Sequence, residues 1–184
     1  MRRACLTFLC ASLLLAGAAL PAPAADLGGL IAPARACPGQ SNPDAPAVEQ
    51  ERAMRCMTNF ARRRSGLRPL GGSALLDRSA ARKSADIIRC DEFSHRACHR
   101  RFTFWIERVG YTAGRDCWRA AENIAWGTGV LGSVRSIFRA WINSSGHREN
   151  ILGRFGQIGI GLRVGGLEGS WRAHVWTQHF GARC

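Results

Sequence analysis

Residues Ala121–Leu152 read AENIAWGTGVLGSVRSIFRAWINSSGHRENIL, with the carboxylate of Glu122 near one end and the imidazole of His147 near the other. Between them four apolar residues recur at i, i+3, i+4 and i+7, the spacing of one helix face: Val134, Ile137, Phe138 and Trp141. Ser133 is a suitable N-cap for this helix, and residues 144–146 are a suitable stop. The pattern predicts a loop, an amphipathic helix, a tight turn and a short second helix, folded so that Glu122 and His147 face one cleft.

Apolar residues upstream of this stretch also repeat at helical spacing. They predict a helix over Ala47–Arg64, a second helix from the N-cap Ser73 to about Cys90, and a short third helix over Phe102–Val109. The segment after the second helix carries His95. We expect His95 to be the third group at the cleft.

Downstream of the central stretch the period changes to two. Residues 158–164 alternate isoleucine, leucine or valine with glycine or arginine, which predicts a strand with one buried face. The pair at 165–166 is expected to open a turn into a second strand over Trp171–Phe180. That strand is expected to carry three residues on each face: His174, Trp176 and Gln178 on one, and Val175, Thr177 and His179 on the other. Helices first and strands last favour an α+β domain, a small antiparallel sheet covered by helices.

The N-terminal residues have the composition of a secretory signal. Residues 1–25 begin with two arginines, continue with an apolar run and end near the small residues of Ala22-Pro23-Ala24. The competing interpretation is a membrane anchor, since the uncharged run over residues 4–25 is just long enough to span a bilayer. We expect residues 1–25 to be removed, residues 26–46 to form an irregular arm, and residues 47–184 to form one domain with no membrane span.

Six cysteines remain after residue 25, and six cysteines in an exported chain suggest up to three disulfides: Cys37, Cys56, Cys90, Cys98, Cys117 and Cys184. The number of possible connectivities is too large for the sequence to choose among them. Our predictions are Cys37–Cys56, which would tie the arm to the first helix, and Cys98–Cys117, which would close a loop near His95. Zinc ligation by Cys90, His95, Cys98 and His99 has suitable spacing, but oxidised cysteines cannot ligate a metal, and export favours disulfides.

The charge is strongly basic and is carried by arginine. Of the 26 basic residues 25 are arginine, and without Arg2 and Arg3 the remaining 24 face 13 acidic residues, a net charge of +11. Such a surface attracts anionic surfaces or polymers. No nucleic-acid recognition motif accompanies the scattered arginines, so a polyanion of the cell envelope is the favoured partner class. A solvated surface with an arginine-biased composition is favoured over any such partner.

Several motifs occur in an order that resembles one family. NFARRRSGLRPL, FSH, AENIAWG, WINSSGHRENIL, GIGL and VWTQHFG follow one another between residues 47 and 181. This set is similar to the CAP superfamily of cysteine-rich secretory, antigen 5 and pathogenesis-related proteins, and most of all to its exported bacterial branch, whose domains are also called SCP-like. The resemblance implies a three-layer α-β-α sandwich with a shallow cleft, and secretion or residence in the cell envelope.

In animal and plant members two histidines and two glutamates line the cleft, and some members bind a divalent metal. By this resemblance His95 and Glu122 match one histidine and one glutamate. The second glutamate position holds Ser144, and the second histidine position holds Val175, while His174 would point to the opposite sheet face. His147 of the bacterial GHR motif is the candidate replacement.

These residues leave two functions open. The first is a binding module whose cleft holds a small lipid, a cell-envelope fragment or a partner, with five lining residues: His95, Glu122, Ser144, His147 and Asn150. The second is an extracellular hydrolase, metal-assisted if His95, Glu122 and His147 hold a zinc ion. The binding module is favoured, because half of the family's two histidines and two glutamates is missing and no assembled nucleophile, such as a G-x-S-x-G elbow, is present. Each residue also has a structural alternative, such as a helix-end hydrogen bond for His95 or a backbone bond for Asn150.

Overall fold

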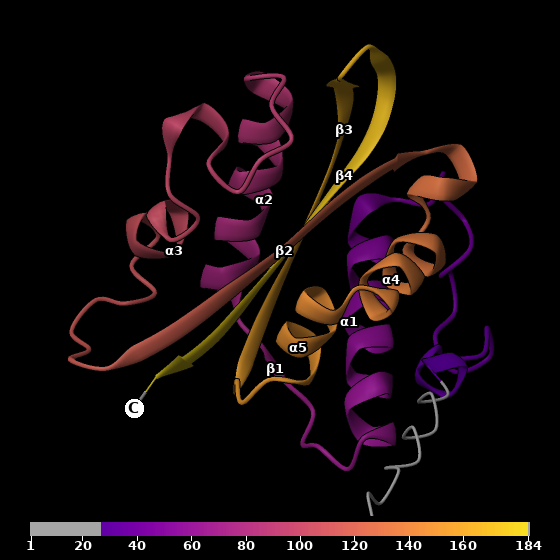
Figure 1. Cartoon of the computed structure of the whole chain (residues 1–184), viewed down its shortest axis with the longest axis horizontal. Helices are drawn as coiled ribbons and strands as arrows, with labels where there is room; N and C mark the ends of the chain where they lie inside the picture. Colours follow the sequence, from indigo (N-terminus) through magenta and orange to yellow (C-terminus); the bar gives the residue numbers. More distant parts are fainter. Residues whose placement is uncertain (1–26, 184) are drawn as a thin grey trace, which may run out of the picture.

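The computed structural model describes residues 27–183, in which helices lie on both sides of a four-stranded sheet (Figure 1). The elements in chain order are η1 (Leu27–Leu30), α1 (Ala47–Arg64), β1 (Gly71–Gly72), α2 (Ala74–Arg89), η2 (Ala97–His99), α3 (Phe104–Arg108), β2 (Trp118–Thr128), η3 (Gly129–Gly132), α4 (Val134–Asn143), α5 (Ser145–Leu152), β3 (Gln157–Leu167) and β4 (Ser170–Arg183). The α+β class and the three layers agree with the prediction.

The sheet has the strand order β1-β3-β4-β2. β4 pairs antiparallel with both β3 and β2, and the two residues of β1 pair parallel with β3. The sheet is therefore antiparallel apart from β1, and β2 is an edge strand. The turn between β3 and β4 falls at Glu168 and Gly169, later than the predicted 165–166, and both residues have positive φ.

The helices begin and end close to the predicted residues. α1 has the predicted bounds. Ser73 and Ser133 cap α2 and α4, with their hydroxyls accepting from the backbone N–H groups of Leu76 and Ser136 at 3.4 Å. α3 is shorter than predicted.

The strand β2 corrects the prediction of a loop at AENIAWG. Its residues pair with β4 along their whole length, from Trp118 to Thr128. The alternation that normally reveals a strand is absent because both faces of β2 carry buried polar groups, Glu122 on one and Asn123 on the other. Hydrogen bonding within the layers, rather than exposure to water, satisfies these side chains.

The strand β3 is covered on both faces, where one buried face was predicted. Ile158, Ile160 and Leu162 join the core beneath α1 and α4. On the opposite face a Cβ at Gly159 would lie 2.0 Å from the Leu76 carbonyl carbon, and one at Gly161 would lie 2.3 Å from that of Ala80. The glycines therefore let the backbone of α2 lie directly on the sheet.

The disulfides agree with one predicted pair and contradict the other. Cys37–Cys56 is present and ties the N-terminal arm to α1. The predicted Cys98–Cys117 bond is wrong, because Cys98 pairs with Cys90, only eight residues away. Positive φ values at Asp91 and Cys98 turn this short loop back on itself. Cys117 is also disulfide-bonded, and Cys184 lies outside the described residues.

The arm before α1 is packed against the domain. Ala32 and Cys37 are buried in the core under α1 and α4, and Arg135 of α4 donates to the carbonyl of Ala32 at 2.9 Å and to Gln40 Oε1 at 2.7 Å. The predicted signal peptide lies outside the described residues. Within residues 27–183 no helix combines the length and the apolarity that crossing a bilayer requires.

Candidate functional site

The centre of the site is the carboxylate of Glu122, which β2 presents to the side of the sheet covered by α2. Its side chain is only 1% exposed. The Nδ1 of His95 lies 2.7 Å from Oε1, and the Nε2 of His179 lies 2.7 Å from Oε2. Lys83 Nζ is 3.9 Å from Oε1. One buried carboxylate thus joins two imidazoles and an ammonium group.

Glu122 is held in its ionised form. Burial alone would raise the pKa of its carboxyl, but hydrogen bonds from His179 and His95 and the charge of Lys83 outweigh burial and hold that pKa below its ordinary value. An ionised carboxylate only accepts hydrogen bonds, so both imidazole N–H groups donate to it. In a neutral His95 the outer nitrogen, Nε2, is then a free acceptor.

The loop that carries His95 is fixed at several points. The Cys90–Cys98 disulfide closes it, and Lys83 Nζ, buried beneath it, donates to the carbonyl of Ser94 at 2.8 Å. The His95 side chain itself is 54% exposed. A ring anchored on one edge and open on the other is suited to meeting a ligand from solution.

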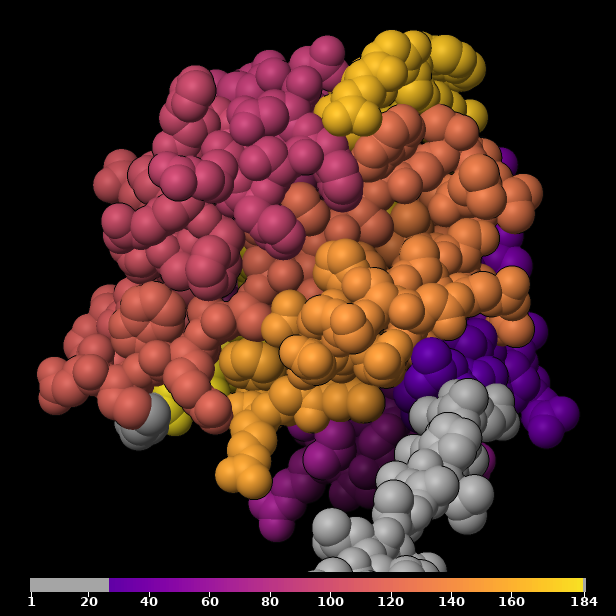
Figure 2. Space-filling view, viewed as in Figure 1, coloured from indigo at the N-terminus to yellow at the C-terminus, as the bar shows by residue number. Residues whose placement is uncertain are grey.

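His147 reaches the same edge of the sheet from the opposite layer. It lies on α5, whose orange surface borders the magenta segment following α2 in Figure 2. Burial lowers the pKa of the His147 imidazole, and a charge on His95 lowers that pKa further. His147 Nδ1 is buried and has no hydrogen-bond partner among residues 27–183. The structure joins His95 and Glu122 at β2, and the convergence of His147 with them stays a prediction.

Two asparagines, Asn123 on the other face of β2 and Asn150 on α5, hold α5 in place. Asn123 Nδ2 donates to the His147 carbonyl at 3.1 Å, and Asn150 Nδ2 donates to Asn123 Oδ1 at 2.9 Å. Asn150 also donates to the Glu122 carbonyl at 3.3 Å. The two asparagines thus bond the backbone and each other, while Ser144 is the half-buried residue that precedes α5.

Sequence reasoning missed three members of the cluster: Ser79, Lys83 and His179. His179 is the direct cross-strand partner of Glu122 in the β2–β4 pair. The alternation in β4 correctly placed it on the face of Val175 and Thr177. Because AENIAWG was predicted to be a loop, the register that joins His179 to Glu122 was not available. His174, as predicted, faces the other way, with Nε2 2.9 Å from the Pro43 carbonyl.

The predicted zinc ligands do not form an assembled site in this geometry. Among residues 27–183 no group of three or more histidine, cysteine, aspartate or glutamate side chains is arranged to hold a metal ion. Both oxygens of Glu122 already accept from imidazole N–H groups, and His147 Nδ1 is buried. Metal binding by His95, Glu122 and His147 stays a prediction, and Cys90 and Cys98 are in a disulfide rather than available as ligands.

A serine, a histidine and a carboxylate do lie in line in this cluster. Ser79 Oγ is 2.6 Å from His179 Nδ1, on the side of the ring away from Glu122. Both Ser79 and His179 are 0% exposed beneath α2. A nucleophile must reach its substrate, and Ser79 cannot because it is buried. The Ser79–His179 pair therefore orients Glu122 and does not act as a nucleophile and its base.

Comparisons with known proteins agree with this architecture. The family model described as "Cysteine-rich secretory protein family" (CAP) matches residues 56–180. The protein YkwD of Bacillus subtilis is 34% identical over 125 residues, which are 67% of this chain and 44% of YkwD. This chain thus spans less than half the length of that relative.

Solved structures share the fold at low identity. An extracellular SCP-domain protein of Bacillus anthracis has a TM-score of 0.56 and 23% identity, over 74% of this chain and 43% of that one. An outer surface protein of Borrelia burgdorferi has a TM-score of 0.62 and 16% identity, over 76% and 97%. A family model that covers most of the domain and a relative above 30% identity agree with the helices, the sheet and the motifs: the chain belongs to the CAP family of cysteine-rich secretory proteins.

Proposed function

We propose that this protein is an exported binding module whose cleft, lined by His95, Glu122 and His147, holds a small fragment of the cell envelope. The observation that carries the proposal is the open edge of the His95 ring, whose side chain is 54% exposed. His95 Nε2 is left free because Nδ1 is anchored on Glu122. A ligand with hydroxyl or amide groups would donate to this nitrogen.

Export is part of this proposal. It is supported by the signal-like composition of residues 1–25 and by structural neighbours that are described as extracellular or outer-surface proteins. The disulfides Cys37–Cys56 and Cys90–Cys98 suit an oxidising compartment.

A hydrolase is the second candidate, and the pairing of His95 with Glu122 is the observation that favours it. An exposed imidazole anchored on a carboxylate is an arrangement that can activate water as a general base. The binding module remains the better supported function, because Ser79, the serine of this network, is buried and a nucleophile must reach its substrate.

Muropeptides from a digested cell wall are the probe that tests the proposal. Their binding is detected by chemical-shift changes in ¹H–¹⁵N NMR spectra of the ¹⁵N-labelled protein. We expect shifts confined to the amides of residues 90–98, 121–124 and 145–150, and their loss in His95→Ala. The matched control is His99→Asn on the same loop, because asparagine tolerates the positive φ of that position. Shifts that persist in His95→Ala, or that lie elsewhere, would contradict the proposed site.

The same samples separate binding from hydrolysis. Mass spectrometry that finds the muropeptides intact supports the binding module. Cleaved products that disappear in His95→Ala, together with stoichiometric zinc that the wild type retains and the variant loses, would establish the metal-assisted hydrolase instead.

A further inference from the structure

The outer face of α2, turned away from the sheet, carries a stripe of arginines over a floor of small residues. Arg78, Arg82 and Arg89 are exposed along this face, and the side chains between them are Ala81 and Ala85. Residues at these spacings lie on one side of a helix. The alanines leave a hollow along the helix that the longer side chains border.

Neighbouring elements supply the walls of this hollow, which we call the arginine groove. Arg163 of β3 lines one side, and Arg100 and Trp105 line the other, around a cavity of about 570 Å³. A second hollow of about 470 Å³ continues past Trp105 to Arg108. Cavities of this size hold small ligands. The groove is distinct from the His95 cleft, which faces the sheet edge.

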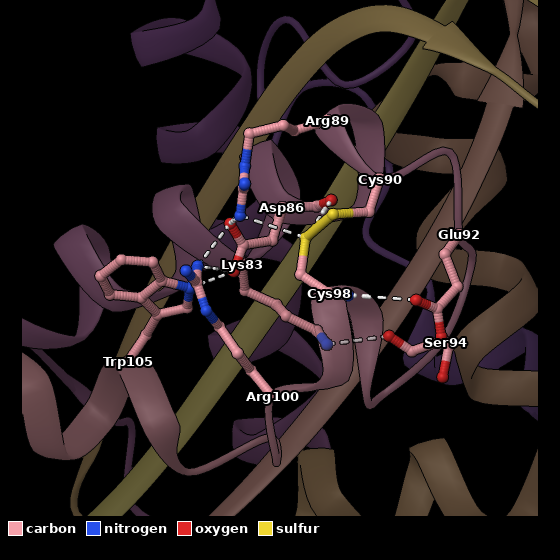
Figure 3. The surroundings of a disulfide bond; sticks show 9 residues. All are labelled: Lys83, Asp86, Arg89, Cys90, Glu92, Ser94, Cys98, Arg100 and Trp105. Carbon is pink, nitrogen blue, oxygen red and sulfur yellow. Dashed lines mark hydrogen bonds and ion pairs between the residues drawn. A yellow bond between two sulfur atoms is a disulfide. The ribbon is translucent and has the colours of Figure 1, made fainter.

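The buried carboxylate of Asp86 organises one end of the groove (Figure 3). Arg89 Nη2 donates to Asp86 Oδ1 at 2.8 Å, Arg100 Nη1 donates to Oδ2 at 2.7 Å, and Trp105 Nε1 donates to Oδ2 at 2.7 Å. Burial would raise the pKa of Asp86, but these hydrogen bonds outweigh it and hold the pKa below its ordinary value. Asp86 is therefore an anion that positions two guanidinium groups.

Trp105 aligns two of the arginines as well. The guanidinium carbons of Arg82 and Arg100 lie 5.2 Å and 5.0 Å from the centroid of its ring. Such cation–π contacts hold flexible side chains in a defined place. Because its ring already carries two guanidinium groups, Trp105 is poorly placed to stack on a nucleobase.

The Cys90–Cys98 disulfide fixes the wall to the floor. It joins the end of α2 to the segment that leads into Arg100, and Arg89 Nη2 lies 3.2 Å from Cys98 Sγ. The groove thus consists of arginines from α2, β3 and the α3 segment, held in register before any ligand arrives. Pre-positioned groups lose less conformational entropy on binding.

We propose that the arginine groove is a binding site for an oligophosphate, a ligand that carries two or more linked phosphate groups. Guanidinium groups bind phosphate oxygens in bidentate pairs, and each phosphate offers enough oxygens for neighbouring arginines to share it. Asp86 is occupied by Arg89, Arg100 and Trp105, so it does not draw Arg78 and Arg82 away from the cavity that they line. Arg163 also lines the cavity, with Nη1 donating to the Leu162 carbonyl at 2.6 Å.

Titration calorimetry with inorganic tripolyphosphate at fixed ionic strength tests the site. We expect one ligand per chain, at least a fivefold loss of affinity in Arg82→Gln, and less than a twofold loss in Arg139→Gln. Arg139 is an exposed arginine of α4, on the other side of the sheet, so both variants remove one positive charge. Equal losses in the two variants would show attraction by the general field and overturn the proposal.

Asp86→Asn distinguishes an organised groove from a charged surface by the sign of its effect. A surface that acts through net charge binds tripolyphosphate more tightly when a carboxylate is removed. The organised groove binds it at least threefold more weakly, because Arg89 and Arg100 lose their anchor. Circular dichroism checks that the variant is folded, and if it is not, the comparison of Arg82→Gln with Arg139→Gln decides alone.

A second experiment distinguishes a lipid headgroup from a soluble oligophosphate. Vesicles doped with a polyisoprenyl diphosphate are compared with undoped vesicles in a sedimentation assay. Binding to the doped vesicles that Arg82→Gln weakens identifies a lipid headgroup, and tripolyphosphate binding without vesicle binding identifies a soluble ligand. Tighter binding of duplex DNA than of tripolyphosphate, unchanged by Arg82→Gln, would contradict the site.

Discussion

Glu122 determines the orientation of every ring around it. It accepts from His95 and His179 at 2.7 Å on opposite oxygens and lies 3.9 Å from the buried Lys83 ammonium. The removal of one member of such a buried network leaves the others without compensation. Glu122 therefore contributes to stability as well as to the shape of the cleft.

Replacing this carboxylate is the first test at the residue scale. Glu122→Gln is expected to cost about 3 kcal/mol, because Lys83 and one imidazole lose their partner. For a domain of this size that is a fall of about 6–12 °C in the thermal midpoint. Glu149→Gln, at an exposed position of α5, is the control and should change the midpoint by no more than about 2 °C. Equal midpoints for the two variants would show that the network is not a source of stability.

The same carboxylate predicts a dependence on pH. Its folded-state pKa is depressed, so its stabilisation is fully present above the unfolded pKa, about 4.3, and is lost as the pH falls through the lower folded value. Denaturant titrations of the wild type should lose stability below about pH 4, and Glu122→Gln should lose less over that interval. A wild type and a variant with the same acid profile would contradict an ionised Glu122.

At this scale the motifs identified His95 and Glu122, which a hydrogen bond joins in the structure, whereas His179 was missed. Its contact with Glu122 joins residues 57 positions apart. Only the pairing of β2 with β4 creates that contact, and no local spacing records it. The Cys90–Cys98 bond was missed for a related reason, since positive φ at Cys98 is a property of the folded loop.

Among the elements, α2 and β3 show how backbone contact shapes the sheet. The helix packs on the strand through Gly159 and Gly161, and in both cases the nearest atoms to an added Cβ belong to the helix backbone. Backbone atoms cannot move aside as a flexible side chain can. The short distance between α2 and β3 therefore depends on glycine, which has no side chain, at positions 159 and 161.

Gly161→Ala tests this close approach. An added methyl group would lie 2.3 Å from Ala80 C and Ala81 N, and overpacking of this kind costs about 1–3 kcal/mol. We expect a fall in thermal midpoint of at least about 2 °C. Gly156→Ala, where a Cβ meets nothing within 4 Å, should leave the midpoint within about 2 °C. A Gly161→Ala variant as stable as Gly156→Ala would mean that α2 does not lie this close to β3.

The helices with one apolar face and the strands β3 and β4 were predicted, whereas β2, which carries buried polar groups on both faces, was not. α1 and α4 follow a 3.6-residue period and were recognised from it. β2 has no such pattern, because Glu122 faces the α2 layer while Asn123 bonds the α5 layer. A strand is recognised from alternating apolar and polar residues only where one of its faces is exposed to solvent. Around Glu122 and Asn123 neither face of β2 is exposed.

In the whole molecule the three layers meet at the edge strand β2, and the candidate cleft lies at that junction. His95 belongs to the segment after α2, Glu122 to β2 and His147 to α5. Figure 1 shows α2 and α5 on opposite sides of β2. The sequence order of the motifs predicted the layers, and the convergence of the three side chains on one cleft stays a prediction. The arginine groove was not predicted, since its members come from α2, β3 and the α3 segment.

The ionisation of His147 measures whether the layers share one cleft. Burial and the neighbouring His95 both lower its pKa, so the folded state binds a proton less readily than the unfolded chain, whose histidine pKa is about 6.5. As the pH falls below about 6.5, His147 therefore subtracts from stability until the folded form also takes up the proton.

The most direct measurement is an NMR titration of the His147 imidazole in the wild type and in His95→Gln. We predict a pKa below 6.5 in the wild type, and a higher value in the variant, still below 6.5 because burial remains. The same pKa in both proteins would mean that His95 and His147 do not face one another, and the cleft formed by His95, Glu122 and His147 would be contradicted.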